Sequence, residues 1–218
     1  MSTYYTPPNP APSPSQGRTL VLHDGSPAAL LACAITREAL SLSPNAKAPR
    51  DLAAIAINAP RPRVNAIARQ CELFSVTLLE HEPLPLPATL PPSDRETHEL
   101  LHAVRFAAHQ GYDRVLWPAS GAQGDHLDLD RIAGIVDRCV LIGRLVALDA
   151  REHKTPSIRV EAPYADYTDR QVADLIADME LPLETSWWWS IAGDGEAERE
   201  KRRWLSAMGA VGWTVAGR

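Results

Sequence analysis

Cysteine is scarce in this chain of 218 residues, which contains only Cys33, Cys71 and Cys139. Three scattered cysteines are too few for a disulfide framework or a four-cysteine zinc site. A surplus of positive charge is also missing, because 22 basic residues face 27 acidic ones and the net charge is −5. This balance argues against direct nucleic-acid binding, which normally requires a basic surplus.

Long hydrophobic runs are absent as well. No segment approaches the ~18–20 continuous apolar residues of a membrane helix. Residues 1–18 have neither the apolar core nor the early positive cluster of a signal peptide. We therefore expect a cytoplasmic protein that does not associate with membranes. The catalytic patterns G-x-S-x-G, Walker A and H-E-x-x-H are also absent from the sequence.

Apolar residues make up 45% of the chain, which is enough for the core of one domain of this length. Nineteen prolines are present, and many of them lie in two clusters. The first predicts a flexible, partly polyproline tail over residues 1–17, with a ligand for a proline-recognising domain as the less favoured alternative. The second, at 83–92, predicts a long loop, because proline neither donates to a β-ladder nor continues a helix.

Between these clusters, short apolar runs alternate with longer amphipathic segments. Strands that alternate with helices predict a mostly parallel sheet covered on both faces. The expected fold class is α/β, with a doubly wound five-stranded sheet over residues 18–182. A Trp-rich helical segment, 183–218, is expected to pack on it. The predicted strands are 19–22, 51–58, 75–79, 113–117 and 157–162, and the predicted helices are 28–40, 63–71, 93–110, 129–148, 169–179 and 196–208.

Several helix boundaries follow from capping residues. Ser26 is a good N-cap, and Pro27 suits a first helical turn, where a missing N–H costs nothing. Ser93 and Glu96 have the spacing of a capping box. Asp128 and Thr168 are expected to cap the two helices that follow.

In a doubly wound sheet, ligands bind outside the carboxyl ends of the strands. The first such loop, after Leu22, is short and contains Gly25 and Ser26. It directs free N–H groups and a helix dipole to one place, which is typical of an anion site. An ordinary capped turn would have the same appearance and is locally the commoner structure.

The segment VLHDGSPAALLACA resembles the start of the PP-loop ATP pyrophosphatases, whose first loop reads S-G-G-x-D-S after a strand. Within that superfamily the chain is most similar to the 7-cyano-7-deazaguanine synthases of queuosine biosynthesis, over residues 19–212. The Pro-rich stretch leading into Arg95 is similar to their P-G-R-N segment. DRVLWPASGAQGD is similar to their strand and G-V-N-x-x-D loop, and SIRVEAPYADYTDRQVADLIADMELPLETSW to their late strand, T-P-L, helix and T-W-S-C-Y segment.

The departures from this family lie where its chemistry would be. Only Gly25 of the loop motif is retained, while Pro27 and Ala28 replace the motif's Asp and second Ser. Asp24 puts a carboxylate where the family cradles pyrophosphate, and a carboxylate repels an anion unless a metal intervenes. No cysteine follows Cys139, so the family's zinc site cannot form.

The resemblance implies an ATP-dependent carbon-nitrogen ligase that activates a deazapurine carboxylate as an adenylate. ATP with magnesium is the implied cofactor, and neither zinc nor another metal site is expected. The catalytic residues stay unknown. The residues implied to bind the nucleotide are His23, Asp24, Gly25, Ser26, Ser120 and Gly121, with Arg95 and Asp125 as candidate phosphate or substrate contacts.

Two further groups of residues have structural explanations. His98, His102 and His109 fall on one predicted helix. Two histidines four residues apart, such as His98 and His102, can bind a metal ion together, but no third ligand is evident nearby, so metal binding is the minor alternative. Five tryptophans follow Ser186. A small apolar core in place of the missing zinc is the favoured interpretation, and an interface for a homodimer or a protein partner is the alternative.

Three functional hypotheses therefore stay open. The first is a PP-loop-type protein with eroded motifs and altered or lost adenylation, which still binds an adenine nucleotide. The second is a non-catalytic scaffold that reuses the fold to hold a partner. The third, which is weaker, keeps the full activity through replacement residues.

Overall fold

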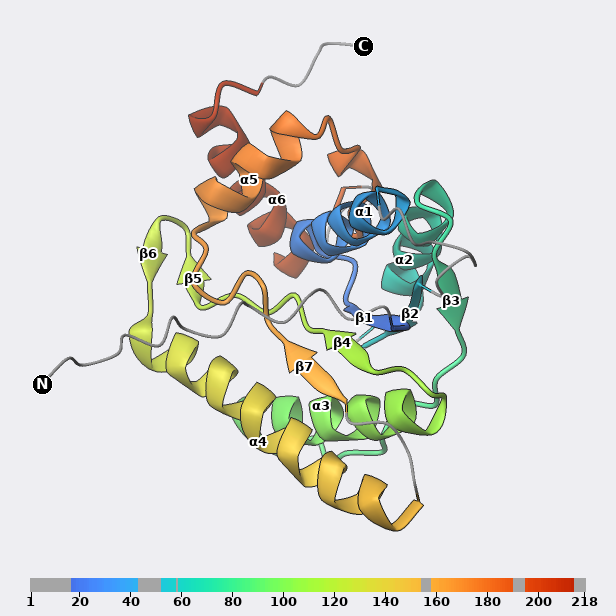
Figure 1. The fold of residues 1–218 in the computed structure, drawn as a ribbon. Helices are drawn as coiled ribbons and strands as arrows, with labels where there is room; N and C mark the ends of the chain where they lie inside the picture. The colour runs from blue at the N-terminus through green and yellow to red at the C-terminus, as the bar shows by residue number, and fades with distance from the viewer. Residues whose placement is uncertain (1–16, 43–51, 58, 154–157, 190–194, 214–218) are drawn as a thin grey trace, which may run out of the picture.

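The computed structural model describes residues 17–42, 52–57, 59–153, 158–189 and 195–213. Most of the predicted tail over residues 1–17 therefore lies outside the described residues. The five strands of the main sheet alternate with helices as the sequence indicates, and two helices close the chain (Figure 1). The strands are β1 (Thr19–His23), β2 (Leu52–Ala56), β3 (Thr77–Leu79), β4 (Arg114–Leu116), β5 (Ala122–Gln123), β6 (His126–Leu127) and β7 (Arg159–Glu161). The helices are α1 (Pro27–Ser41), α2 (Arg61–Leu73), α3 (Pro92–His109), α4 (Leu129–His153), α5 (Asp169–Asp178) and α6 (Gly195–Ala210), with a 3₁₀ turn at Leu183–Thr185.

Five of the strands form one sheet in the order β3-β2-β1-β4-β7, and all four pairings are parallel. The chain builds outward from β1 in one direction to β3 and then crosses to the other side with β4 and β7. The order reverses between β1 and β4, and ligands bind at such a switch point in open α/β sheets. The predicted doubly wound, five-stranded α/β fold is confirmed.

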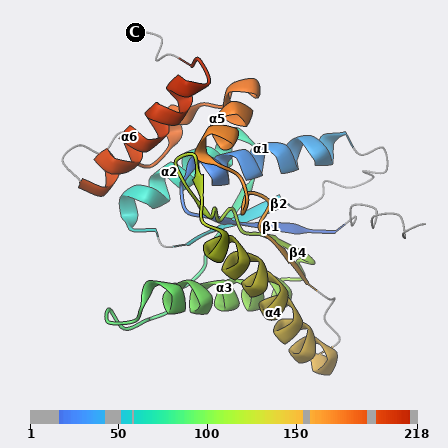
Figure 2. The ribbon, with the colours of Figure 1, turned by 90° about the vertical axis from the view of Figure 1, so that its left-hand side faces the viewer.

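Helices cover both faces of this sheet (Figure 2). One hydrophobic cluster joins side chains of α1, α2, α5 and α6 to one face, and a second joins α3 and α4 to the other. The alternation of side chains along β1 divides them between the clusters: Val21 belongs to the first, whereas Leu20 and Leu22 belong to the second.

Most capping predictions are confirmed. The Ser26 Oγ accepts a hydrogen bond from the Ala29 N–H at 3.3 Å, and Pro27 opens α1. The Asp128 Oδ1 accepts from the Arg131 N–H at 3.0 Å in the first turn of α4. Thr168 and Gln171 form a full capping box at the start of α5.

The predicted capping box at Ser93 is wrong. Helix α3 begins one residue earlier, at Pro92, with Pro91 at its N-cap and no side-chain cap. The Glu96 carboxylate instead lies 3.6 Å from Arg138 and 3.9 Å from Arg131, both on α4. Glu96 is therefore held by two guanidinium groups of the neighbouring helix, which outweigh a backbone N–H at its own helix end.

The predicted loop after Trp117 also differs, because it contains a short antiparallel hairpin of β5 and β6. Gly124, with a φ of +65°, turns the chain between the two strands. Two-residue strands leave no hydrophobic alternation in a sequence, so the pattern gave no signal for them. No helix in the described part of the chain is long and apolar enough to cross a membrane.

Candidate functional site

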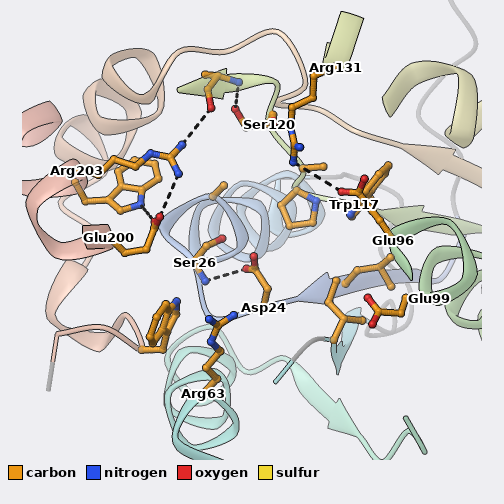
Figure 3. A pocket seen from close by; sticks show the side chains of 18 of the residues that line it. Asp24, Ser26, Arg63, Glu96, Glu99, Trp117, Ser120, Arg131, Glu200 and Arg203 are labelled. Carbon is orange, nitrogen blue, oxygen red and sulfur yellow. Dashed lines mark hydrogen bonds and ion pairs between the residues drawn. The ribbon is translucent and has the colours of Figure 1, made fainter. Parts of the chain in front are cut away.

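A cavity of about 440 Å³ opens at the carboxyl ends of β1 and β4, where the strand order reverses (Figure 3). Its floor is apolar and includes Leu22, Ile57, Leu100 and Trp117. Its walls come from the loops after β1 and β4 and from five helices, α1, α2, α3, α4 and α6. The polar and charged side chains around it are Asp24, Ser26, Arg63, Glu96, Glu99, Ser120, Gln123, Arg131, Glu196, Glu200 and Arg203.

The loop between β1 and α1 uses its own side chains to satisfy its N–H groups. The Gly25 N–H donates to the His23 Nδ1 at 3.1 Å, and the Ser26 N–H donates to the Asp24 Oδ1 at 2.9 Å. The Ala29 N–H is taken by the Ser26 Oγ, and Pro27 has no N–H to offer. The Asp24 carboxylate therefore occupies a position at the start of α1 that would suit an external anion (Figure 3).

His23 is the last residue of β1 and is fully buried. Burial lowers the pKa of its imidazole to about 4, and the nearby Asp24 carboxylate only partly opposes this effect. Since the Nδ1 accepts a hydrogen bond from Gly25, the proton of the neutral ring lies on the Nε2. His23 thus holds the loop from behind and is not among the residues that line the cavity.

Gly25 is required by the backbone at this loop. Its φ is +81°, and a Cβ there would lie 3.3 Å from the Cδ1 of Trp187. Trp187 is itself one wall of the cavity, and the guanidinium of Arg63 lies 4.0 Å from the centre of a Trp187 ring. The one retained residue of the loop motif therefore serves the turn and the packing of the C-terminal segment.

The loop after β4 forms the opposite wall. The Ser120 Oγ accepts from the Ala122 N–H at 3.0 Å, and its side chain lines the cavity. Gly121 lies behind it, where a Cβ would come within 2.4 Å of the Ile132 Cγ1 and 3.0 Å of the Ala165 carbonyl oxygen. Gly121 thus allows this loop to pack closely against α4, and it does not line the cavity.

Ion pairs hold most of the charged groups around the cavity. The Arg63 Nη2 lies 2.6 Å from Glu196, and Arg131 lies 3.9 Å from Glu96. Arg203 pairs with Glu200 at 3.4 Å and with Asp169 at 2.5 Å. Because every arginine of the wall already faces a carboxylate, a phosphate group entering the cavity would have to displace one of these partners.

Asp169 anchors one side of this wall although it is only 2% exposed. Its Oδ2 accepts from the Gly124 N–H at 2.9 Å, and both its oxygens accept from the Arg203 guanidinium, at 2.5 and 2.6 Å. The hydrogen bonds that Arg203 donates to Asp169 raise the pKa of Arg203 further, so this arginine stays charged. One carboxylate therefore ties the β5–β6 hairpin and α6 to the start of α5.

The structure brings together some of the predicted site residues and separates others. Asp24, Ser26 and Ser120 line the cavity, while His23, Gly25 and Gly121 support the two loops from behind. Arg95 donates from its Nη2 to the carbonyl oxygen of Pro87 at 2.9 Å, so it fastens the Pro-rich loop. Asp125 is exposed in the β5–β6 turn. Neither Arg95 nor Asp125 reaches the cavity wall.

Sequence reasoning missed the charged side chains that helices contribute from outside the strand ends. Glu96 and Glu99 come from α3, Arg131 from α4, and Glu200 and Arg203 from α6. Only their helical spacing marked them in the sequence, and it is the same as that of any solvent-exposed face. The sequence did not show that α6 folds back over the cavity, so the side chains of α6 could not be assigned to it.

No group of three histidine, cysteine, aspartate or glutamate side chains suited to a metal ion occurs in the described residues. His102 instead packs its ring 4.7 Å from that of His81. The three cysteines are buried and free. Burial raises the pKa of the thiol to about 12 in Cys71 and to about 11 in Cys139, so these groups stay protonated.

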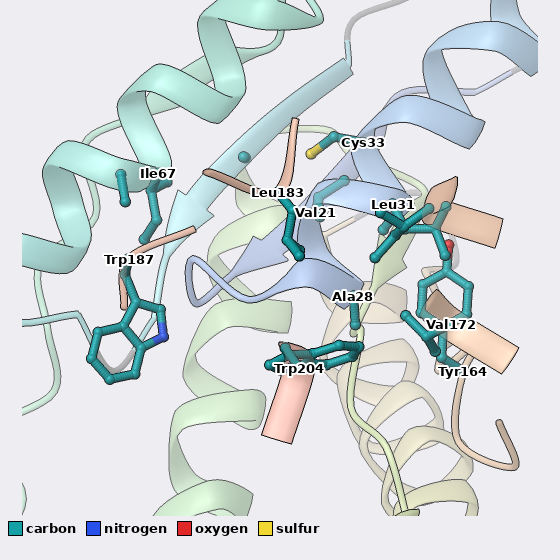
Figure 4. Packing of buried hydrophobic residues seen from close by; sticks show 14 of the residues in the cluster. Val21, Ala28, Leu31, Cys33, Ile67, Tyr164, Val172, Leu183, Trp187 and Trp204 are labelled. Carbon is teal, nitrogen blue, oxygen red and sulfur yellow. The ribbon is translucent and has the colours of Figure 1, made fainter. Parts of the chain in front are cut away.

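The tryptophans of the C-terminal segment belong to the core. Trp187, Trp188 and Trp204 are 5% exposed or less, and Trp189 and Trp213 pack against the same cluster. Figure 4 shows Trp187 and Trp204 among the aliphatic side chains of that cluster. This burial favours the structural interpretation of the tryptophans over an exposed interface.

No protein-family model matches the sequence, and no curated protein matches it. A solved structure does: the U34-tRNA thiolase NcsA from Methanococcus maripaludis with its [4Fe-4S] cluster, at a TM-score of 0.50 and 16% identity. The similarity covers 90% of this chain and 71% of NcsA. At this identity the likeness concerns the fold alone. Together with the observed sheet order, it shows that the chain shares the doubly wound, parallel α/β fold of that structure.

Proposed function

We propose that this protein binds an adenine nucleoside or nucleotide in the cleft and has lost the release of pyrophosphate from ATP. The observation that carries the proposal is the β1–α1 loop, where the N–H groups of Gly25, Ser26 and Ala29 are satisfied by side chains of the loop itself. A catalytic phosphate cradle needs such donors free and aimed at the developing charge. The 7-cyano-7-deazaguanine synthases, which the sequence resembles, depend on that cradle.

The charge of the cleft supports the same conclusion. Five carboxylates line it, from Asp24, Glu96, Glu99, Glu196 and Glu200, against three guanidinium groups, from Arg63, Arg131 and Arg203. A triphosphate adds several negative charges to such a site, whereas a base with exocyclic amino groups offers donors to it. The apolar floor suits the flat face of a heterocycle. We therefore expect the base and the sugar to supply the binding energy.

Calorimetry with adenosine, AMP and ATP, with and without magnesium, tests the proposal. We expect adenosine and AMP to bind, ATP to bind no more tightly than AMP, and no pyrophosphate to form from ATP. Binding of ATP at least about tenfold tighter than adenosine, which corresponds to 1.4 kcal/mol, would contradict it. So would conversion of 7-carboxy-7-deazaguanine to its amide or nitrile, which would restore the hypothesis of a complete enzyme.

Two substitutions of Asp24 separate charge from hydrogen bonding. Asp24→Gly removes the carboxylate and frees the Ser26 N–H, so we expect it to bind inorganic pyrophosphate more tightly than the wild type does. Asp24→Asn removes the charge and keeps an acceptor for the Ser26 N–H. If Asn raises the affinity as much as Gly does, repulsion alone excludes the anion. If neither variant binds pyrophosphate, the loop is not the barrier.

A scaffold without catalysis is the second candidate function. The buried tryptophans do not offer the interface that the sequence suggested for it. The exposed apolar face of α4 is the observation that favours it, because such faces mark interaction sites. A cytoplasmic location and the absence of nucleic-acid partners stay predictions under either function.

A further inference from the structure

Helix α4 has two apolar faces, and the fold covers only one of them. Ile135, Cys139, Ile142 and Val146 are buried and repeat at intervals of four and three residues. They pack in the hydrophobic cluster between α4 and the sheet. An apolar face of a helix is normally buried against the rest of the protein. The second face of α4 departs from this rule.

Six of the nine large apolar side chains that are exposed in the described residues lie on α4. The helix packs against α3 and β7, and its outer side lies at the periphery of the molecule in both views (Figures 1 and 2). The two most exposed near the middle and the end of the helix are Leu141 at 63% and Leu148 at 57%. The six are Leu129, Val136, Val140, Leu141, Leu145 and Leu148.

Two opposite charges interrupt this outer face, Asp137 and Arg144. Both are exposed, and no hydrogen bond or ion pair joins either of them to another described residue. They lie at equal distances on either side of the midpoint between Val140 and Leu141. The face is therefore complementary in charge to its own copy when that copy runs in the opposite direction.

We propose that a second copy of this chain docks on the outer face of α4, with the two α4 helices antiparallel about a twofold axis between Val140 and Leu141. In that arrangement the Asp137 of each protomer faces the Arg144 of the other. The axis also places Val140 opposite Leu141 and Val136 opposite Leu145, so apolar side chains meet apolar side chains. A twofold interface of this kind is self-complementary and closed.

The charge pattern selects this direction against the alternative. A parallel pair would put Asp137 beside Asp137 and Arg144 beside Arg144, and like charges at an interface are strongly unfavourable. The 25 residues of α4 extend over about 37 Å, which gives room for three heptads of contact. This interface lies away from the tryptophans and is independent of the proposed ligand.

Sedimentation equilibrium of the full chain tests the proposal, since a dimer has twice the mass of the 23.8-kDa chain. We expect the wild type to be dimeric at micromolar concentration. Leu141→Asp puts two carboxylates at the axis and should weaken dimerisation by about 100-fold or more. Leu73→Asp is the matched control, because Leu73 is 51% exposed at the end of α2 and should leave the dimer intact.

A charge reversal tests the direction of packing. Asp137→Arg and Arg144→Asp each bring like charges together and should each weaken the dimer by about tenfold or more. The double variant restores both ion pairs and should recover most of the wild-type dissociation constant. Since these side chains are exposed, circular dichroism should show all variants folded.

The outcomes that overturn the proposal are distinct from one another. A wild-type chain that stays monomeric up to high micromolar concentration leaves no role for a second copy. A dimer that persists in Leu141→Asp uses another surface. Failure of the double charge variant to recover dimerisation, with both single variants impaired, rejects the antiparallel geometry.

Discussion

Helices α1 and α4 are alike in one respect, because each carries apolar side chains on more than one face. Their surroundings differ. Nine of the 15 residues of α1 are buried, under the sheet on one side and under α5 and the Trp-rich segment on the other. Helix α4 has one buried row and one exposed row. The apolar residues of a helix therefore indicate surfaces that favour burial. They do not show whether the same chain or a partner buries them.

The largest effect is expected from the side chains that bury α1. Trp188 is fully buried in the cluster that contains Leu31 and Cys33 of α1. We expect Trp188→Ala to lower the free energy of unfolding by about 3–5 kcal/mol, as measured by urea titration. Trp188→Phe should cost less, because it keeps most of the volume and removes an indole N–H that has no partner. Equal losses in the two variants would show that the volume of the side chain is not what matters.

A matched pair of substitutions sharpens the contrast between the two helices. Leu31→Ala on α1 removes a side chain with no exposure, and we expect a loss of about 2–5 kcal/mol. Leu145→Ala on α4 makes the same chemical change at 41% exposure, and we expect about 0.5 kcal/mol or less in the monomer. The measurement is urea unfolding at concentrations where the chain is monomeric. Similar losses at the two sites would remove the distinction.

The contribution of His23, the last residue of β1, to the free energy of unfolding should depend on pH. The folded protein holds the pKa of His23 at about 4, below the usual 6.5, because the ring is buried. The unfolded chain therefore binds this proton first as the pH falls. The stabilisation is complete above about pH 6.5 and decreases toward pH 4, by up to about 3 kcal/mol.

His23→Asn is the variant that isolates this group, because its side-chain oxygen can still accept from the Gly25 N–H. We expect its unfolding free energy to fall less steeply between pH 6.5 and pH 4 than that of the wild type. The lowered pKa of His81 adds a slope in the same direction, which both proteins share. Parallel curves would mean that His23 is not the titrating group.

A modest effect is expected at the two amino-terminal caps, which are built alike. Ser26→Ala at α1 and Asp128→Ala at α4 each remove the acceptor for one helical N–H. We expect each to lower the free energy of unfolding by about 1 kcal/mol. A much larger loss for Ser26→Ala would indicate that the β1–α1 loop depends on this hydroxyl beyond the cap.

The fold was predictable because its signals are local. The apolar run Thr19–Leu22, the cap at Ser26 and the cap at Thr168 each determine a boundary within a few residues of themselves. Repetition of such units leaves a doubly wound parallel sheet as the expected arrangement. The hairpin of β5 and β6 was not predictable, because its strands of two residues leave no periodic pattern.

The cavity was predicted at the right strand ends but with an incomplete set of side chains. Asp24, Ser26 and Ser120 lie in the loops that follow β1 and β4, and they line it. Arg203 comes from a helix about eighty residues further along the chain, and its place depends on the packing of α6. Contacts between residues so far apart in the sequence cannot be predicted from local periodicity. The same holds for Glu96, which pairs with arginines of α4 and does not cap α3.

The anchor at Asp169 has a consequence for the speed of ligand exchange. For α6 to move away from the cleft, Arg203 must leave a carboxylate that is 2% exposed and would then have lost its charged partner. An unpaired charge in so little water is strongly unfavourable, so such openings are rare. We expect ligands to enter and leave past a wall that stays closed on this side, at rates set by diffusion through the mouth of the cleft and not by a moving helix.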